Sequence, residues 1–182
     1  KLNTTIGPDG NHSLDDLFEM GYGAVCLAVG AHKSQSLSIP GEDLPGVVHG
    51  IDVLKTISLI HQHDDVKNEI NLLKVLRQGT NTRIAVLGGG NTAIDVARSL
   101  KRYNAQDVRI LYRRTRAEMP AMPEEVEDAE TEGIGLDFLV SPVRVIGDKV
   151  TGVAGLECMR MELGEPDASG RRRPGPIPES EF

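Results

Sequence analysis

Three consecutive glycines follow a short apolar stretch in the middle of the chain, where residues 86–98 read VLGGGNTAIDVAR. The spacing Gly88-x-Gly90-x-x-Ala93 is the G-x-G-x-x-G/A form of the dinucleotide-binding fingerprint. Its first glycine allows a tight turn, its second lets the backbone approach a pyrophosphate, and its small third residue lets the helix pack closely on the strand. The alternative is a turn that binds nothing, but three glycines carry an entropic cost that such a turn does not offset.

Gly89, Asn91 and Thr92 complete the candidate phosphate site, because phosphate charge lies against the N–H groups that open a helix. Thr92 is also expected to donate a hydrogen bond to a phosphate oxygen. Helix capping is the alternative role for Asn91 and Thr92. For Asp95 capping and dipole complementarity are the preferred interpretation, since a carboxylate would repel a pyrophosphate.

Arginines stand where an acidic residue would select NAD. About twenty residues after the glycines the chain reads VRILYRRTR, and Arg113 directly follows the predicted strand, with Arg114 and Arg116 next. A guanidinium group binds phosphate bidentately, so the cluster is predicted to hold the 2′-phosphate of NADP. Alternatively, the arginines form a solvated basic loop that pairs with Glu118 or Glu124.

The elements that would position these residues follow one another in a regular order. The region around the glycines predicts strands alternating with helices, followed by hairpins: strand 84–87, helix 91–103, strand 108–112, a helix from Pro123 to near Gly133, strand 136–140, strands 143–146 and 150–163 around a turn at 147–149, and a turn at 167–170. We therefore predict an α/β fold: a Rossmann-like parallel sheet with helices on both faces, plus an antiparallel hairpin or meander.

The N-terminal third contains four further predicted features. Ser13 is a candidate N-cap of a short helix, residues 24–30 predict a strand buried on both faces, residues 39–46 form a loop, and helical spacing covers 51–63 and 66–78. The chain begins without Met and is expected to be a piece of a longer protein.

Composition excludes several classes of function. The net charge of −7 disfavours nucleic acid or an anionic membrane as a partner, and no long apolar run predicts a membrane helix, so the cytoplasm is the expected location. Cys26 and Cys158 form no C-x-x-C pair for a redox centre or a cysteine-ligated cluster, and both are expected to be buried in strands. His61-x-His63 lacks further ligands at zinc-binding spacing, so no metal site is predicted.

No catalytic side chain is predicted. Tyr-x-x-x-Lys is absent, which disfavours a short-chain dehydrogenase, and a methyltransferase would place an acid where Arg113 stands. The EEVEDAE run is interpreted as a solvated helix face. Hydride transfer between cofactors needs no acid–base residue from the protein.

The combination of motifs resembles one flavoprotein family. The segments VLGGGNTAIDVARSLKR, VRILYRRTRAEMPAMPEEVEDAETEGI, LECMRMELGEPDASGRR and PIPESEF are similar to the NADPH-binding domain of the glutamate synthase small (β) subunit and its relatives, which include the reductase half of dihydropyrimidine dehydrogenase. The upstream AVCLAVGAHKSQSLSIPGEDLPGV looks like the connection from the flavin domain. Residues 61–78 have no counterpart that we can assign.

The resemblance implies a function and a division of the chain. Residues 1–46 would be a remnant of the FAD-binding domain and a linker, 47–172 the NADPH-binding domain, and 173–182 the return towards the FAD-binding domain. NADPH would pass hydride to FAD, and electrons would continue to iron–sulfur clusters and a partner subunit. The earlier G-x-G-x-x-G of a flavin site and the cluster cysteines are absent from this chain, so the fragment is not expected to bind FAD or to be active alone. The alternative is a non-catalytic nucleotide-sensing or subunit-docking module.

Overall fold

The computed structural model describes residues 4–27, 30, 34, 36–62, 82–168 and 170–182. The chain divides into two compact units, residues 1–33 and 34–182, which are described separately. Within the described residues, no helix combines the length and the apolar character needed to span a membrane. The predicted helix at 66–78 and residue His63 lie outside the described residues, as does the side chain of His61.

The first unit confirms the predicted helix but not the predicted strand. Helix α1 (Leu14–Glu19) begins at Ser13, whose Oγ accepts from the backbone N–H of Asp16 while the Asp16 carboxylate accepts from the Ser13 N–H. Residues 24–27 form no strand, Cys26 is exposed, and Leu27 is 75% exposed. The prediction of a buried strand and a buried Cys26 is wrong here, because a strand needs paired neighbours and none of the described residues pairs with this segment.

The second unit contains the parallel sheet that the sequence predicts. Strands β1 (Arg83–Leu87), β2 (Asp107–Tyr112) and β3 (Gly135–Phe138) pair in the order β1-β2-β3. Helix α4 (Asn91–Arg102) connects β1 to β2, and α5 (Pro123–Thr131) precedes β3. The carboxyl ends of β1 and β2 therefore meet at one edge of the sheet, with Leu87 beside Leu111.

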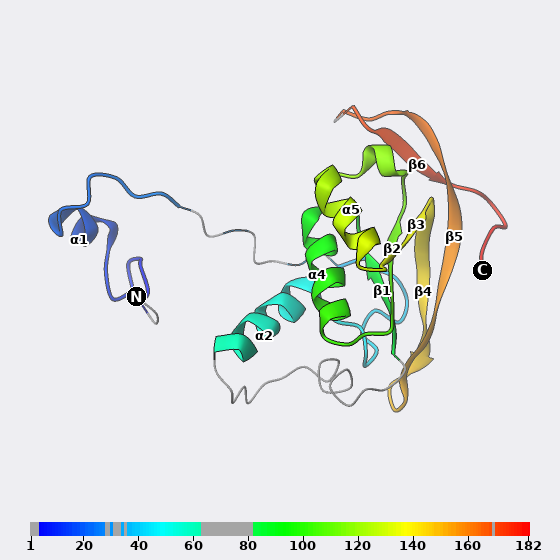
Figure 1. Ribbon diagram of the computed structural model, residues 1–182, viewed down its shortest axis with the longest axis horizontal. Helices are drawn as coiled ribbons and strands as arrows, with labels where there is room; N and C mark the ends of the chain where they lie inside the picture. Colours follow the sequence, from blue (N-terminus) through cyan, green and yellow to red (C-terminus); the bar gives the residue numbers. More distant parts are fainter. Residues whose placement is uncertain (1–3, 28–29, 31–33, 35, 63–81, 169) are drawn as a thin grey trace. The chain divides into compact units, whose positions relative to one another are not determined.

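All described helices of this unit share one core on one face of the sheet (Figure 1). Alternate residues of the first two strands, including Val86, Val108 and Ile110, pack against α4, α5 and α2 (Gly50–Gln62). The expectation of helices on both faces is corrected for the described residues: the first two strands of an antiparallel sheet face the second side, across a cavity. A parallel sheet needs both faces covered, and here a second sheet supplies the cover.

The antiparallel sheet contains β4 (Val140–Asp148), β5 (Gly152–Pro166) and β6 (Arg172–Pro176), in that order. Leu139, with φ of +57°, lies between the two sheets, so the predicted strand 136–140 is split there. The turn lies at 149–151, later than predicted, because the Asp148 carboxylate accepts from the N–H groups of Val150 and Thr151. Cys158 on β5 is buried as predicted.

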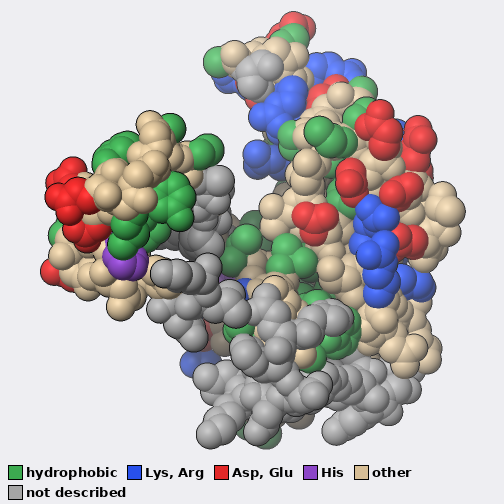
Figure 2. All heavy atoms as spheres, turned by 60° about the vertical axis from the view of Figure 1, so that its left-hand side comes forward, with side chains coloured by type: hydrophobic (Ala, Val, Ile, Leu, Met, Phe, Trp, Pro, Cys, Tyr) green, Lys and Arg blue, Asp and Glu red, His purple; other side chains and the backbone are tan. Residues whose placement is uncertain are grey.

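An ion-pair cluster joins α4 to α5. Arg98, whose side chain is 17% exposed, contacts Glu125 at 2.6 Å, Asp128 at 3.0 Å and Glu132 at 2.9 Å. Arg102 also contacts Glu132, at 2.6 Å. Figure 2 shows basic and acidic side chains lying next to one another on the helical side. The cluster thus connects α4 and α5, the two helices that pack on the core beside the glycine turn.

This cluster predicts an acid dependence of stability. The hydrogen bond from Arg98 holds the pKa of Glu132 below its ordinary value of 4.5. A depressed pKa in the folded state contributes stability above pH 4.5, and that contribution is lost as the pH falls through the folded value. The urea concentration at the unfolding midpoint should fall as the pH drops from about 5 to about 3 in the wild type. We expect this fall to be smaller in Glu132→Gln. Glu127→Gln, an exposed change on α5, serves as the control. A Glu132→Gln profile with the wild-type slope would contradict the assignment.

Candidate dinucleotide site at the carboxyl edge of the parallel sheet

The fold itself requires glycine at position 88. Gly88 has φ of +135°, a region that side chains disfavour, and its N–H donates to the Leu111 carbonyl at 3.1 Å. A Cβ at this position would lie 3.4 Å from the Cβ of Ala93. The turn therefore brings the start of α4 close to β1, the packing that a small residue at position 93 is predicted to permit.

The fold also requires glycine at position 89. A Cβ there would lie 2.6 Å from the ring of Tyr112, which is buried at the end of β2. The Tyr112 hydroxyl donates to the Glu118 carbonyl at 2.7 Å, so the ring is held in place. The Gly89 carbonyl accepts from the Ala121 N–H at 3.1 Å. These two hydrogen bonds thus attach the segment 115–122 to β2 and to the glycine turn.

Nothing within the described part of the chain requires glycine at position 90. Gly90 has φ of −95° and ψ of 170°, which any residue adopts, and a Cβ there would find only Pro120 Cγ, at 3.9 Å. Gly90 is the N-cap of α4 and provides no side-chain cap. The first N–H groups of a helix have no acceptor within it. This helix start therefore offers donors and leaves space beside them.

The polar residues of the first helical turn have separate roles. The Asn91 Oδ1 accepts from the Met122 N–H at 3.0 Å, so this side chain ties α4 to the segment 115–122. Thr92 is exposed. Asp95 is also exposed and lies beyond the first turn, which contains no acidic residue. Asp95 therefore does not cap the helix, and no carboxylate of α4 opposes an anion at its start.

The three arginines of the cluster have different environments. Arg113 is exposed and makes no hydrogen bond or ion pair with any described residue. Arg114 is only 6% exposed, and its guanidinium donates to Asp167 at 2.8 Å and to the Arg172 carbonyl at 2.7 Å.

Arg116 is exposed and contacts Glu130 at 2.7 Å. Neither Glu118 nor Glu124 pairs with Arg113, Arg114 or Arg116. The structure therefore does not show the alternative of a basic loop that pairs with these two glutamates. Of the three guanidinium groups, that of Arg113 is the one that meets a ligand without first breaking a contact within the described chain.

Sequence reasoning missed the residues that brace this loop. Glu118, 7% exposed, accepts from the Thr115 N–H at 3.1 Å and pairs with Arg172 on β6 at 2.6 Å. These hydrogen bonds, that from the Thr115 side chain above all, hold the pKa of the Glu118 carboxyl below its usual value. The sequence suggested Glu118 only as a possible partner of the arginine cluster, and only the tertiary fold brings Arg172 to it.

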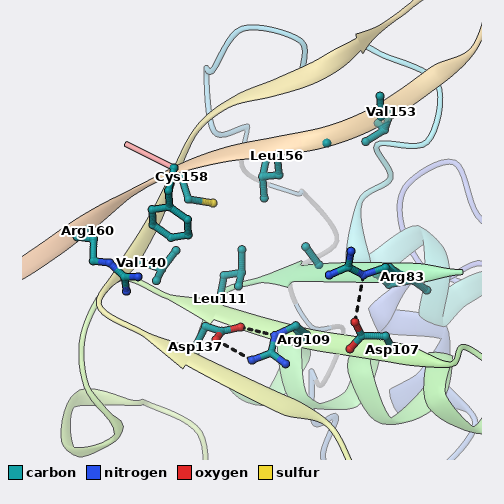
Figure 3. Close-up of a pocket in the computed structure, with 15 residues that line it drawn as sticks. Arg83, Asp107, Arg109, Leu111, Asp137, Val140, Val153, Leu156, Cys158 and Arg160 are labelled. Carbon is teal, nitrogen blue, oxygen red and sulfur yellow. Dashed lines mark hydrogen bonds and ion pairs between the residues drawn. The ribbon is translucent and has the colours of Figure 1, made fainter. Parts of the chain in front are cut away.

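A cavity of the second unit lies elsewhere. Its volume is about 610 Å³, and it separates the parallel sheet from β4 and β5 (Figure 3). Two ion pairs, Arg83 with Asp107 and Arg109 with Asp137, stand on its floor, and Cys158 lies opposite. None of the predicted site residues lines this cavity. The candidate site is therefore the carboxyl edge of the parallel sheet and not this cavity.

Comparison with known proteins agrees with this architecture. The profile of the pyridine nucleotide-disulphide oxidoreductase family matches residues 4–167. The chain is 43% identical over 183 residues to the NADPH-Fe(3+) oxidoreductase subunit beta of Geobacter sulfurreducens, covering 99% of this chain and 25% of that protein. It is 41% identical over 183 residues to the NADP(+)-dependent formate dehydrogenase subunit beta of Moorella thermoacetica, covering 100% of this chain and 23% of that protein.

A glutamate synthase small chain is also among the relatives. That of Halomonas elongata is 38% identical over 162 residues, covering 88% of this chain and 32% of that protein. The chain thus spans between about a quarter and a third of the length of these relatives. The structure of Mycobacterium tuberculosis FprA in complex with NADPH superimposes with a TM-score of 0.59 and 24% identity, covering 94% of this chain and 50% of that one, which shows a shared fold. By its profile match and these relatives, the chain belongs to the pyridine nucleotide-disulphide oxidoreductase family.

Proposed function

We propose that this chain is the NADPH-binding part of a flavin-dependent oxidoreductase similar to the glutamate synthase small subunit. The observation that carries the proposal is Gly90: the fold needs glycine at 88 and 89 but not at 90. Neither the backbone angles nor the packing among the described residues requires glycine at 90, and the helix start there has no side-chain cap. A glycine in such a place fits the close approach of a pyrophosphate. The names of the relatives, which specify NADPH or NADP(+), support the choice of coenzyme.

The proposed roles of the residues follow from their positions. Gly88, Gly89 and Ala93 shape the turn, and Gly90 with the N–H groups of Asn91 and Thr92 receives the pyrophosphate. Arg113 holds the 2′-phosphate, and its guanidinium, which is exposed and has no partner among the described residues, supports this choice. Arg116 would reach the phosphate only by exchanging Glu130 for it, and Arg114 only by leaving Asp167. We therefore assign Arg114 to bracing the loop.

The chemistry of the whole protein extends beyond this chain. NADPH supplies hydride from its nicotinamide, and FAD in the rest of the parent protein would accept it, with iron–sulfur clusters and a partner subunit downstream. The domain boundaries that we propose are 1–46, 47–172 and 173–182. Residues 40–46 contact the antiparallel sheet, where the carbonyls of Pro40 and Pro45 accept from Val145 and Val153. The second compact unit accordingly begins earlier, at residue 34.

Calorimetry on the 182-residue chain tests the proposal. We expect NADPH to bind at least about tenfold more tightly than NADH, because a bidentate contact to a charged phosphate contributes roughly 1.5–3 kcal/mol. Adenosine 2′,5′-bisphosphate should compete with NADPH, and adenosine 5′-monophosphate should compete weakly. If neither NADPH nor NADH gives a measurable heat of binding, the docking-module alternative is favoured.

A further inference from the structure

The tip of the β5–β6 hairpin is bonded to the arginine loop through two arginines. Arg172 on β6 contacts the Glu118 carboxylate with Nε at 2.7 Å and Nη2 at 2.6 Å. Its backbone carbonyl accepts from Arg114 Nε at 2.7 Å, and Asp167, the first residue after β5, accepts from Arg114 Nη2 at 2.8 Å. The hairpin, more than fifty residues later in the chain, thus contacts the loop at Arg114 and at Glu118, both on the C-terminal side of Arg113.

The Glu118 carboxylate transmits this contact to the loop backbone. Its Oε2 accepts from the Thr115 N–H at 3.1 Å and from the Thr115 hydroxyl, while its Oε1 receives Arg172. The backbone carbonyl of Glu118 accepts a hydrogen bond from the Tyr112 hydroxyl, and the Tyr112 ring covers Gly89. One residue therefore connects the arginine loop, the glycine turn and the hairpin.

We infer that Arg172 and Glu118 are positioning residues for coenzyme discrimination: the hairpin fixes the backbone of residues 112–115 so that the exposed Arg113 is presented to the 2′-phosphate. The inference rests on the proposed function. Neither residue is required to touch the coenzyme. An exposed arginine loses side-chain and loop entropy when it binds a ligand, and a loop already fixed by its neighbours reduces that loss. The cost of ordering would otherwise fall on NADPH binding and much less on NADH binding.

Four variants of the 182-residue chain test this, each titrated with NADPH and with NADH by calorimetry. Arg172→Ala is expected to lower NADPH affinity by roughly fivefold and NADH affinity by less than about twofold, the scale of losing one structural hydrogen-bond pair. Arg172→Lys, which keeps the charge but not the two-point contact, should give an intermediate loss. Arg173→Ala is the matched control: Arg173 is exposed, its side chain makes no hydrogen bond or ion pair with any described residue, and its substitution removes the same charge.

Glu118→Gln separates positioning from direct contact. If Arg172 instead binds the phosphate itself, Glu118→Gln frees it from its ion pair and leaves NADPH affinity unchanged or higher. If Arg172 acts through Glu118, Glu118→Gln lowers NADPH affinity as Arg172→Ala does. An unchanged ratio of NADPH to NADH affinity in both variants, even with a lower melting temperature, would overturn the inference and show a structural role only.

The outcomes also distinguish this inference from the proposed function. Wild-type preference for NADPH that survives both variants refutes the positioning role and leaves the proposed function standing. Absence of a wild-type preference refutes the proposed 2′-phosphate site, and this inference falls with it.

Discussion

Arg113→Ala is expected to lower the affinity of the chain for NADPH by about 1–3 kcal/mol, roughly 5- to 150-fold, and to leave NADH affinity within about twofold. The variant removes the only guanidinium group of the cluster that has no partner among the described residues. Because NADH lacks the 2′-phosphate, its binding has nothing to lose at this position. Titration calorimetry at two salt concentrations measures the effect, and the NADPH-specific loss should shrink at high salt.

Arg116→Ala provides the graded comparison for this prediction. Arg116 is engaged with Glu130 on an exposed surface, so its removal should weaken NADPH by less than Arg113→Ala does. An Arg113→Ala variant that binds NADPH as the wild type does would remove Arg113 from the site. A larger loss for Arg116→Ala would move the phosphate to that side of the loop.

Gly90→Ala is expected to weaken NADPH and NADH equally, by roughly tenfold or more, while the melting temperature stays close to that of the wild type. The backbone at 90 already has dihedral angles that alanine adopts, and the added Cβ meets no atom closer than 3.9 Å. The entropic gain from replacing glycine and the poorer N-cap are of similar size and opposite sign. The new methyl group instead occupies the space through which a pyrophosphate would approach the helix start.

The neighbouring glycines supply the contrast. Gly88→Ala places a side chain at φ of +135°, and Gly89→Ala drives a Cβ into the Tyr112 ring, so both are expected to lower the melting temperature. Loss of binding in these two variants would follow from damage to the turn. Full coenzyme binding by Gly90→Ala would show that the pyrophosphate lies elsewhere, whichever coenzyme the chain prefers.

Together the two variants locate two different parts of one ligand. Arg113→Ala reports on the group that distinguishes the coenzymes, whereas Gly90→Ala reports on the group that they share. A discrimination ratio that changes only in the first variant, with affinity for both coenzymes lost in the second, is the pattern that the proposed function predicts.

Sequence reasoning was correct where the signal was local. The run of apolar residues before Gly88 gives β1, the 3.6-residue spacing after Gly90 gives α4, and Pro123 opens α5 at its first position. It was wrong at residues 24–27, where an equally apolar run forms no strand in the described chain. Apolar character indicates that a segment can be buried, but pairing partners decide whether a strand forms.

The glycine pattern, the arginine cluster and the order of strands and helices were determined by the sequence alone, because turn geometry, helix spacing and residue chemistry act over a few neighbouring residues. The tertiary structure alone decided which arginine remains available. Asp167 and Arg172 approach Arg114, and Glu130 approaches Arg116, only after β5, β6 and α5 have packed in place. Ion pairs between residues far apart in the chain depend on that packing, and no spacing within the chain encodes them.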